Sequence, residues 1–94
     1  MRLKAGRRTE YEIYWEILSF CKPGRTFTQI VGRCDLNSKI AQEYIEFLSG
    51  KGYLAKVPEG ERNLYKTTAG AGEFMSLFAK IYQELFDNSP EFKL

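Results

Sequence analysis

The sequence of 94 residues contains no histidine, so it lacks the most common general base and the most common metal ligand. It has two cysteines, which are too few for a structural zinc site. No nucleophile is paired with a base along the chain, and no glycine-rich loop follows a predicted strand. We therefore expect no catalytic residue, no metal site, no cofactor and no small-molecule ligand, and predict that the protein is not an enzyme.

The two cysteines, Cys21 and Cys34, are too far apart along the chain to form a C-x-x-C redox pair. We expect both to be small buried apolar side chains. A disulfide between them stays open only for a hyperthermophilic source, because intracellular disulfides do occur in such organisms.

Long apolar runs are also missing. No stretch approaches the roughly 20 residues that cross a membrane, and the basic start of the chain, residues 1–4, lacks the apolar segment of a signal peptide. We expect an intracellular protein, cytoplasmic and nucleoid-associated, with no membrane partner. The length is suited to a single domain.

What the sequence does contain is an uneven distribution of charge around a net value of +2. Residues 1–8 hold four basic and no acidic side chains, and residues 20–66 hold eight basic against five acidic ones. The two remaining segments are acidic overall. A DNA-binding surface formed by the N-terminal arm and the middle of the chain would explain this pattern, and so would a solvated surface with a basic tail.

The first strong helix signal follows the arm. Thr9 and Glu12 have the spacing of a capping box, in which each side chain satisfies a free backbone N–H of the helix start. Apolar residues then recur at steps of three and four, which predicts an amphipathic helix over residues 10–21. Pro23 and Gly24 end it, since proline interrupts the hydrogen-bond ladder and glycine accepts a left-handed turn.

Two further helices are predicted by their caps. Thr26 and Gln29 repeat the capping-box pattern and start a short helix that reaches about Gly32. Asn37 caps a third helix over residues 38–50. We expect its apolar side to be buried, namely Ile40, Ala41, Tyr44, Ile45, Phe47 and Leu48. Its opposite side carries Lys39, Gln42, Glu43 and Glu46.

The periodicity then changes to that of a β-hairpin with a polar tip. Residues 53–57 and 63–67 are the predicted strands, and residues 58–61 are the predicted turn. A short helix, a turn and a second helix form a helix-turn-helix unit, and the following hairpin makes it a winged helix.

The last predicted helix is capped by Thr67 or Thr68 and is apolar over more than one stripe. Its a/d spacing is typical of a coiled coil, and one layer of helices in so small a domain leaves much of it uncovered. A homodimer would bury the residues that we assign to dimerisation, which are Phe74, Leu77, Phe78, Ile81, Tyr82 and Leu85. The alternative is burial of the whole stripe against the first helix.

The predicted fold class is therefore mainly α with a small β-hairpin, a winged helix-turn-helix plus a C-terminal dimerisation helix. The predicted domains are a basic N-terminal arm over 1–8, the winged helix-turn-helix over 9–67, the dimerisation helix over 68–88 and a loose tail over 89–94.

The sequence resembles the archaeal winged-helix DNA-binding proteins over residues 9–86. The likeness rests on residues 12–18, Cys21, residues 28–30, residues 36–38, Tyr44, Leu48 and residues 51–54. It is nearest to the ten-kilodalton Sulfolobus-type chromatin and regulator proteins, which dimerise through a C-terminal antiparallel coiled coil. The resemblance implies double-stranded DNA binding as a homodimer, by a transcription regulator or small chromatin protein. The last helix here is shorter than in that family, which favours a compact dimer.

The candidate DNA contacts follow from the predicted winged helix. Base edges would be read from the start of the third helix, and phosphates from helix N-termini, wing and arm. The assigned residues are Arg7, Arg8, Arg25, Thr26, Ser38, Lys39, Gln42, Lys56 and Arg62. Four acids on the same elements, Glu43, Glu46, Glu59 and Glu61, favour the alternative of a protein–protein interaction module without direct DNA binding.

Overall fold

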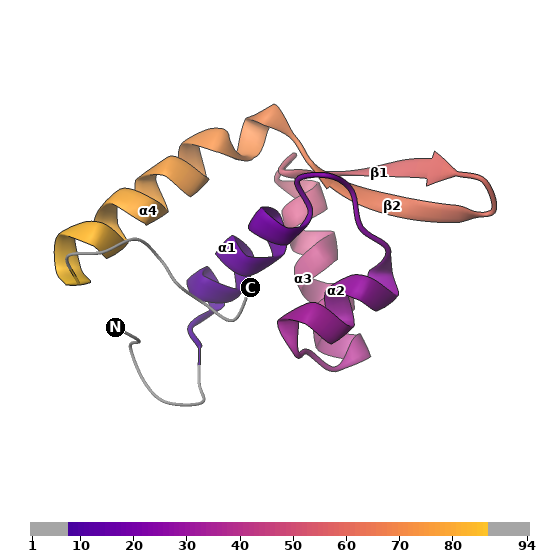
Figure 1. The fold of residues 1–94 in the computed structure, drawn as a ribbon, viewed down its shortest axis with the longest axis horizontal. Coiled ribbons are helices and arrows are strands. Elements are labelled where there is room, and N and C mark those ends of the chain that lie inside the picture. The colour runs from indigo at the N-terminus through magenta and orange to yellow at the C-terminus, as the bar shows by residue number, and fades with distance from the viewer. Residues whose placement is uncertain (1–7, 87–94) are drawn as a thin grey trace.

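The computed structural model describes residues 8–86, and most of the predicted arm, with Arg7, and the predicted tail lie outside this range. Figure 1 shows the first helices of the chain in one group, a hairpin that projects from this group, and a last helix that starts beside the base of the hairpin and runs in the opposite direction. The elements in chain order are α1 (Glu10–Phe20), α2 (Phe27–Cys34), α3 (Ser38–Gly50), β1 (Leu54–Glu59), β2 (Arg62–Thr67), the short 3-10 helix η1 (Ala69–Ala71) and α4 (Gly72–Phe86). The predicted class, mainly helical with a winged helix-turn-helix, is confirmed.

The capping signals are confirmed as local hydrogen bonds. The Thr9 hydroxyl accepts from the Glu12 N–H at 3.1 Å, and the Thr9 N–H donates to the Glu12 carboxylate at 2.7 Å. The Thr26–Gln29 pair repeats this at 3.2 and 2.9 Å. Asn37 accepts from the third-position N–H of α3 at 2.8 Å. Since these bonds span three residues, the sequence predicts them well.

Helix ends depart slightly from the prediction. The first helix ends one residue earlier, at Phe20, and the turn after it uses Gly24 at a φ of 96°. The second helix runs past Gly32 to Cys34, because the residue that stops it is Asp35, in the left-handed conformation at a φ of 58°. Asp is one of the few non-glycine residues that tolerates this conformation.

The hairpin is longer than predicted. Pro58 and Glu59 continue β1, with Pro58 opposite Asn63 and Glu59 opposite Arg62, so the turn consists of residues 60–61 alone. A proline is tolerated there because a two-stranded ribbon leaves one edge of each strand without a hydrogen-bonded neighbour. The base of the hairpin is held by Arg25, whose backbone exchanges hydrogen bonds of 3.0 and 2.7 Å with Tyr65.

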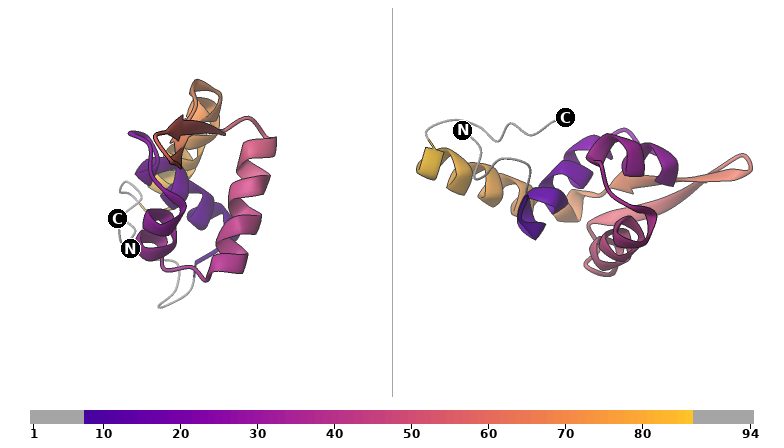
Figure 2. Two further views of the ribbon diagram at one scale, coloured as in Figure 1. Left: turned by 90° about the vertical axis from the view of Figure 1, so that its right-hand side faces the viewer. Right: turned by 90° about the horizontal axis from the view of Figure 1, so that it is seen from below.

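The core forms where α1 meets α2, α3 and the base of the hairpin. Its most deeply buried side chains have at most 1% of their surface exposed and are Ile17, Leu18, Cys21, Ile30, Cys34, Ile45, Leu48 and Ala71. The two perpendicular views in Figure 2 show α1 between α2 and α4. Burial of these apolar side chains supplies the main favourable term in folding.

The prediction that Phe47 is buried is wrong, since 49% of its surface is exposed. The buried line of α3 runs through Ala41, Ile45 and Leu48, and Phe47 lies on its flank. Ile40 and Tyr44, which are also predicted to be buried, are half-buried. There it stacks on Tyr14 of α1, with ring centroids 5.2 Å apart. The sequence pattern shows that the helix is apolar at this position. It does not show that the ring of Phe47 is covered on one side and exposed on the other.

The entry to the last helix resolves the alternative between two threonines. Thr68 caps the short helix η1, accepting from the Gly70 N–H at 3.1 Å, and its hydroxyl donates to the carbonyl of Gly52. Thr67 instead donates its hydroxyl to the Leu18 carbonyl at 2.6 Å. The two neighbouring threonines thus tie the end of the hairpin to α1 and to the turn that follows α3.

A largely buried ion pair links Arg8, which precedes the cap residue of α1, to the helix itself. Arg8 donates to the carboxylate of Glu16, a residue with 0% of its surface exposed, and also contacts the backbone carbonyl of Asp35 at 3.4 Å. Only 20% of the Arg8 side chain is exposed. The guanidinium therefore compensates a charge that would be costly to bury alone.

Both cysteines are buried free thiols. Burial raises the pKa of the Cys21 thiol to about 12, with a smaller contribution from Cys34. Burial also raises the pKa of Cys34 to about 11, with the neighbouring Glu16 carboxylate as a second cause. At neutral pH neither is a thiolate, the form that reacts with disulfides and alkylating reagents.

We expect Arg8→Ala to lower the free energy of unfolding by about 3 kcal/mol, because it removes a cation that offsets the buried charge of the Glu16 carboxylate. Urea denaturation monitored by circular dichroism measures this. The matched control is the double replacement Arg8→Met with Glu16→Leu, which removes both charges and should recover most of the loss. A single replacement with no effect would show that the pair does not stabilise the fold.

The raised pKa values predict that both thiols resist a disulfide reagent in the folded protein and react at once in denaturant. As pH rises above the ordinary thiol value of 9.0, ionisation of the unfolded thiols destabilises the fold, over a window that extends to about 11 for Cys34 and about 12 for Cys21. Thiol titration with and without urea checks the first statement. Rapid reaction of both thiols in the native state would contradict it.

Candidate nucleic-acid interface

The elements that carry the predicted DNA contacts lie together at one end of the molecule. The helices α2 and α3 and the hairpin are grouped there, and α4 extends toward the opposite end (Figure 1). Of the assigned residues, Arg25, Thr26, Ser38, Lys39, Gln42, Lys56 and Arg62 belong to this group, and Arg8 lies just before α1. Arg7 lies outside the described residues.

The exposed side of α3 is the side predicted to meet the bases. Ser38, Lys39 and Gln42 are all exposed there. The amide of Gln42 donates to the Glu46 carboxylate at 3.0 Å. A carboxylate only accepts, so this contact fixes the amide nitrogen toward Glu46 and leaves the amide oxygen and the second N–H available for a base edge.

The two acids of α3 occupy different surroundings. Glu46 is bound to Gln42, whereas Glu43 lies close enough to Tyr44, on the flank facing α1, to raise the pKa of its hydroxyl. The main cause of that raised pKa is burial, followed by Glu10 and then Glu43. Only one of the two carboxylates is therefore engaged with a predicted DNA contact.

A pair of arginines meets at the end of α1, and only one of them, Arg25, is predicted from the sequence. The Arg25 guanidinium lies 4.2 Å from the ring centroid of Phe20, and its Nε donates to the Phe20 carbonyl at 2.9 Å. Arg33 of α2 lies 5.8 Å from the same ring. Neither guanidinium forms an ion pair within residues 8–86. Only the packing of the folded chain brings Arg33 here, and its spacing gives no signal of it.

The predicted contacts at the other positions are less free than the sequence suggests. The hydroxyl of Thr26 is used as the cap of α2. Arg62 forms an exposed ion pair with Glu59 at 3.4 Å, which screens part of its charge. Lys56 is exposed on β1 and forms no ion pair with any described residue. Arg8 is held by Glu16, as described above.

The residues assigned to dimerisation divide into two groups on α4. One group faces its own chain, since Phe74 stacks on Tyr53 at 5.9 Å, Phe78 stacks on Trp15 at 5.7 Å, and Tyr82 is 4% exposed. The other group is exposed, and consists of Leu77 (51%), Ile81 (59%) and Leu85 (68%). These three lie one turn apart along a single stripe, which we call the α4 stripe.

An apolar groove adjoins this stripe, and one of its walls is not predicted from the sequence. Tyr11 is 63% exposed and borders, together with α4, a hollow of about 190 Å³. Its lining is Thr9, Tyr11, Glu12, Phe78, Ile81, Tyr82 and Leu85. Because α1 and α4 are distant in sequence, their shared groove is visible only in the folded chain.

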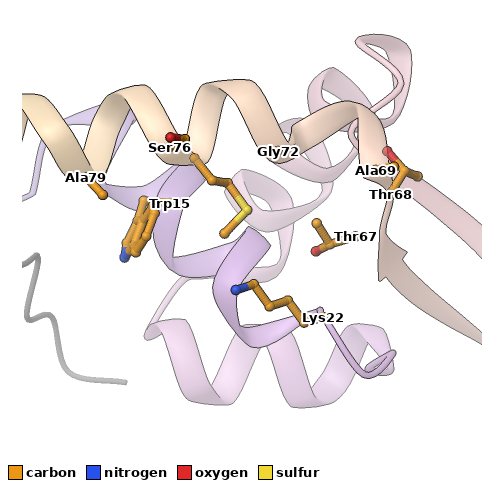
Figure 3. Close-up of a pocket in the computed structure, with 9 residues that line it drawn as sticks. Trp15, Lys22, Thr67, Thr68, Ala69, Gly72, Ser76 and Ala79 are labelled. Atoms are coloured by element: carbon orange, nitrogen blue, oxygen red, sulfur yellow. The ribbon is translucent and has the colours of Figure 1, made fainter.

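A larger hollow of about 510 Å³ lies between the second half of α1 and the start of α4. Figure 3 shows Trp15 and Lys22 on one wall, with Thr67, Thr68 and α4 along the other. The two threonine hydroxyls are already bound to the carbonyls of Leu18 and Gly52. Among the described residues, Lys22 is the one charged side chain that lines it.

Metal-binding and membrane-spanning features are both absent from residues 8–86. No three side chains of metal-binding types lie near enough together in this range to hold an ion. No helix of the same range has the length and apolar character needed to cross a bilayer.

Solved structures with this arrangement come from archaea and bacteria. Sso10a-2, described as a DNA-binding protein from Sulfolobus solfataricus, is 28% identical, with a TM-score of 0.72 over 85% of this chain and 87% of that one. The Mb0332 domain from Mycobacterium bovis, described as a homodimeric winged helix-turn-helix DNA-binding domain, is 18% identical, with a TM-score of 0.68 over 85% and 77%. MepR of Staphylococcus aureus, solved with DNA, is 15% identical, with a TM-score of 0.68 over 83% and 66%.

None of the curated proteins matches the chain in sequence. A family model does match, and it covers residues 7–85, nearly all of the described chain. With its helix order, wing and match to this model, the chain belongs to the winged helix-turn-helix family.

Proposed function

We propose that the protein binds double-stranded DNA, with α3 in the major groove and the hairpin beside it on the backbone. The carrying observation is the exposed face of α3 with Lys39 and the oriented Gln42, grouped with the hairpin and α2 at one end of the molecule. In helix-turn-helix proteins the second helix of the unit reads the major groove. Sso10a-2 is described as a DNA-binding protein, which supports the same assignment.

We further propose that the protein acts as a homodimer in which α4 stripes from two copies pack together. The stripe exposes Leu77, Ile81 and Leu85, and the adjoining groove exposes Tyr11, so a second copy would remove a continuous apolar surface from water. A two-fold axis through the stripe also supplies two α3 helices for a symmetric DNA site.

Within this function, two roles stay as proposals, a transcription regulator or a small chromatin protein acting at the nucleoid. Footprinting separates them, because a regulator protects discrete sites and a chromatin protein coats DNA uniformly. The alternative of a protein-interaction module is supported by the exposed Phe47 and by Glu59 and Glu61 near the hairpin tip. This alternative predicts that the protein does not bind DNA even at low salt.

For DNA binding, we expect Lys39→Ala and Arg62→Ala to weaken affinity and to reduce the slope of log K against log [salt] by about 1 for each phosphate that is no longer neutralised. Lys80→Ala, an exposed charge on α4, is the matched control and should change little. Fluorescence anisotropy with a labelled duplex over a salt series measures both. Equal effects from all three, or no binding at low salt, would overturn the proposed interface.

For the dimer, we expect Ile81→Asp to yield monomers of about the chain mass, 10.9 kDa, in light scattering across a wide concentration range. A charge in the centre of the α4 stripe would be buried without a partner. Gln83→Asp, exposed on the opposite side of α4, is the control and should stay dimeric. Phe78→Asp is a poorer test, because Phe78 also stacks on Trp15 within its own chain. A wild-type protein that is monomeric throughout would contradict the dimer.

A further inference from the structure

Four aromatic rings form an exposed patch where α1 passes the second half of α3, and the proposed DNA contacts do not use it. We call Tyr11, Tyr14, Tyr44 and Phe47 the aromatic patch. Tyr14 is its centre, stacked on Phe47 at 5.2 Å and packed edge-on against Tyr44 at 5.5 Å and Tyr11 at 6.3 Å. Tyr11 is 63% exposed and Phe47 is 49% exposed. Tyr14 and Tyr44 are half-buried, and Tyr11 also borders the groove next to the α4 stripe. Rings gathered in this way and left partly exposed indicate a binding surface.

Two carboxylates border the aromatic patch. Burial is the main cause that raises the pKa of Tyr14 and of Tyr44, and Glu10 is the second cause for both. Glu43 contributes at Tyr44 as well. Both acids are exposed, and neither forms an ion pair within residues 8–86. Ring faces and carboxylates attract the same ligand, a guanidinium or an ammonium group.

The chain itself supplies such groups next to the aromatic patch. Residues 1–7 carry Arg2, Lys4 and Arg7 and no acid. They join the described chain at Arg8, two residues before Glu10, and Arg8 is already near enough to lower the pKa of Tyr44. Seven extended residues reach about 23 Å, which is ample for a patch that begins at Tyr11.

We propose that residues 1–7 bind across the aromatic patch of their own chain, with basic side chains over the rings and between Glu10 and Glu43. A tethered segment has an effective concentration in the range of mM, so contacts that would be weak between separate molecules suffice. The segment is basic and the two residues that border the patch, Glu10 and Glu43, are acidic. This opposite charge, and a tether held beside the patch by the Arg8–Glu16 pair, favour this occupant over a separate protein.

A consequence for DNA binding rests on the proposed function. Each of the three basic side chains of residues 1–7 can pair either with a carboxylate beside the patch or with a DNA phosphate, but not with both at once. The aromatic patch and its two bordering carboxylates then compete with DNA for residues 1–7, and weakly bound DNA does not displace these residues from the patch. Removing the two carboxylates would release the arm and raise DNA affinity.

A nitroxide placed by Leu3→Cys tests the contact without removing a cation, since the native thiols are buried. We expect the label to broaden the ring signals of Tyr44 and Phe47 in NMR spectra of the full chain. Glu10→Gln with Glu43→Gln should abolish most of the broadening. Glu61→Gln with Glu73→Gln, two exposed acids elsewhere, is the matched control and should leave it unchanged.

Two outcomes would overturn the proposal. One is broadening that is absent, or that persists equally in both pairs of variants. The other comes from a mixture of nitroxide-labelled chains with isotope-enriched chains that carry no nitroxide. Broadening of the ring signals of the isotope-enriched chains would show that the arm occupies the patch of a second copy.

The competition with DNA has its own cycle. We expect Glu10→Gln with Glu43→Gln to raise DNA affinity several-fold in the intact chain, and clearly less when Arg2, Lys4 and Arg7 are all changed to Gln. Equal gains in affinity with and without the three basic residues would show that the two carboxylates act on DNA binding directly. That result would refute the competition. If no variant binds DNA, the proposed function fails, while the ring signals still report on the contact.

Discussion

The packing of apolar side chains on α1 is the constraint on which the other elements depend. Ile17 and Leu18 are fully buried, and α2, β2 and α4 all contact this one helix. Its two ends serve different ends of the molecule, because its last turn meets the base of the hairpin through Thr67 and its first turns face α4 and the aromatic patch. A helix of 11 residues thus connects the proposed DNA surface to the proposed dimer surface.

The features that sequence predicts well here are the ones that close within a few residues. The Thr9 and Thr26 capping boxes, the Asn37 cap and the span of α3 depend on neighbours in the chain, and all are as expected. The exposure of Phe47 and the pairing of Pro58 were missed because they depend on distant partners, namely Tyr14 and the opposite strand. Hydrophobic periodicity identifies an apolar side chain but does not indicate how many elements will cover it.

The candidate site shows the same limit more strongly. The exposed face of α3 follows from helical periodicity, so Lys39 and Gln42 could be assigned from sequence. Three other features could not be assigned in this way, because they depend on tertiary packing or on side-chain conformation. They are the contact of Arg25 and Arg33 with Phe20, the Arg62–Glu59 ion pair and the Arg8–Glu16 ion pair. Composition therefore shows which charges are present, and only the fold shows which of them are already neutralised.

The backbone bridge between Arg25 and Tyr65 has a mechanical consequence. Together with the hydrogen bonds from Thr67 to α1 and from Thr68 to Gly52, it fixes the hairpin to the helix-turn-helix unit at several points. Within one protomer these bonds hold the wing and α3 at a fixed distance and orientation, which suit a single groove geometry. Under the proposed mode of binding, adaptation to DNA of different curvature or site spacing then requires a change at the junction with α4. The quantity that would change is the angle at which α4 packs.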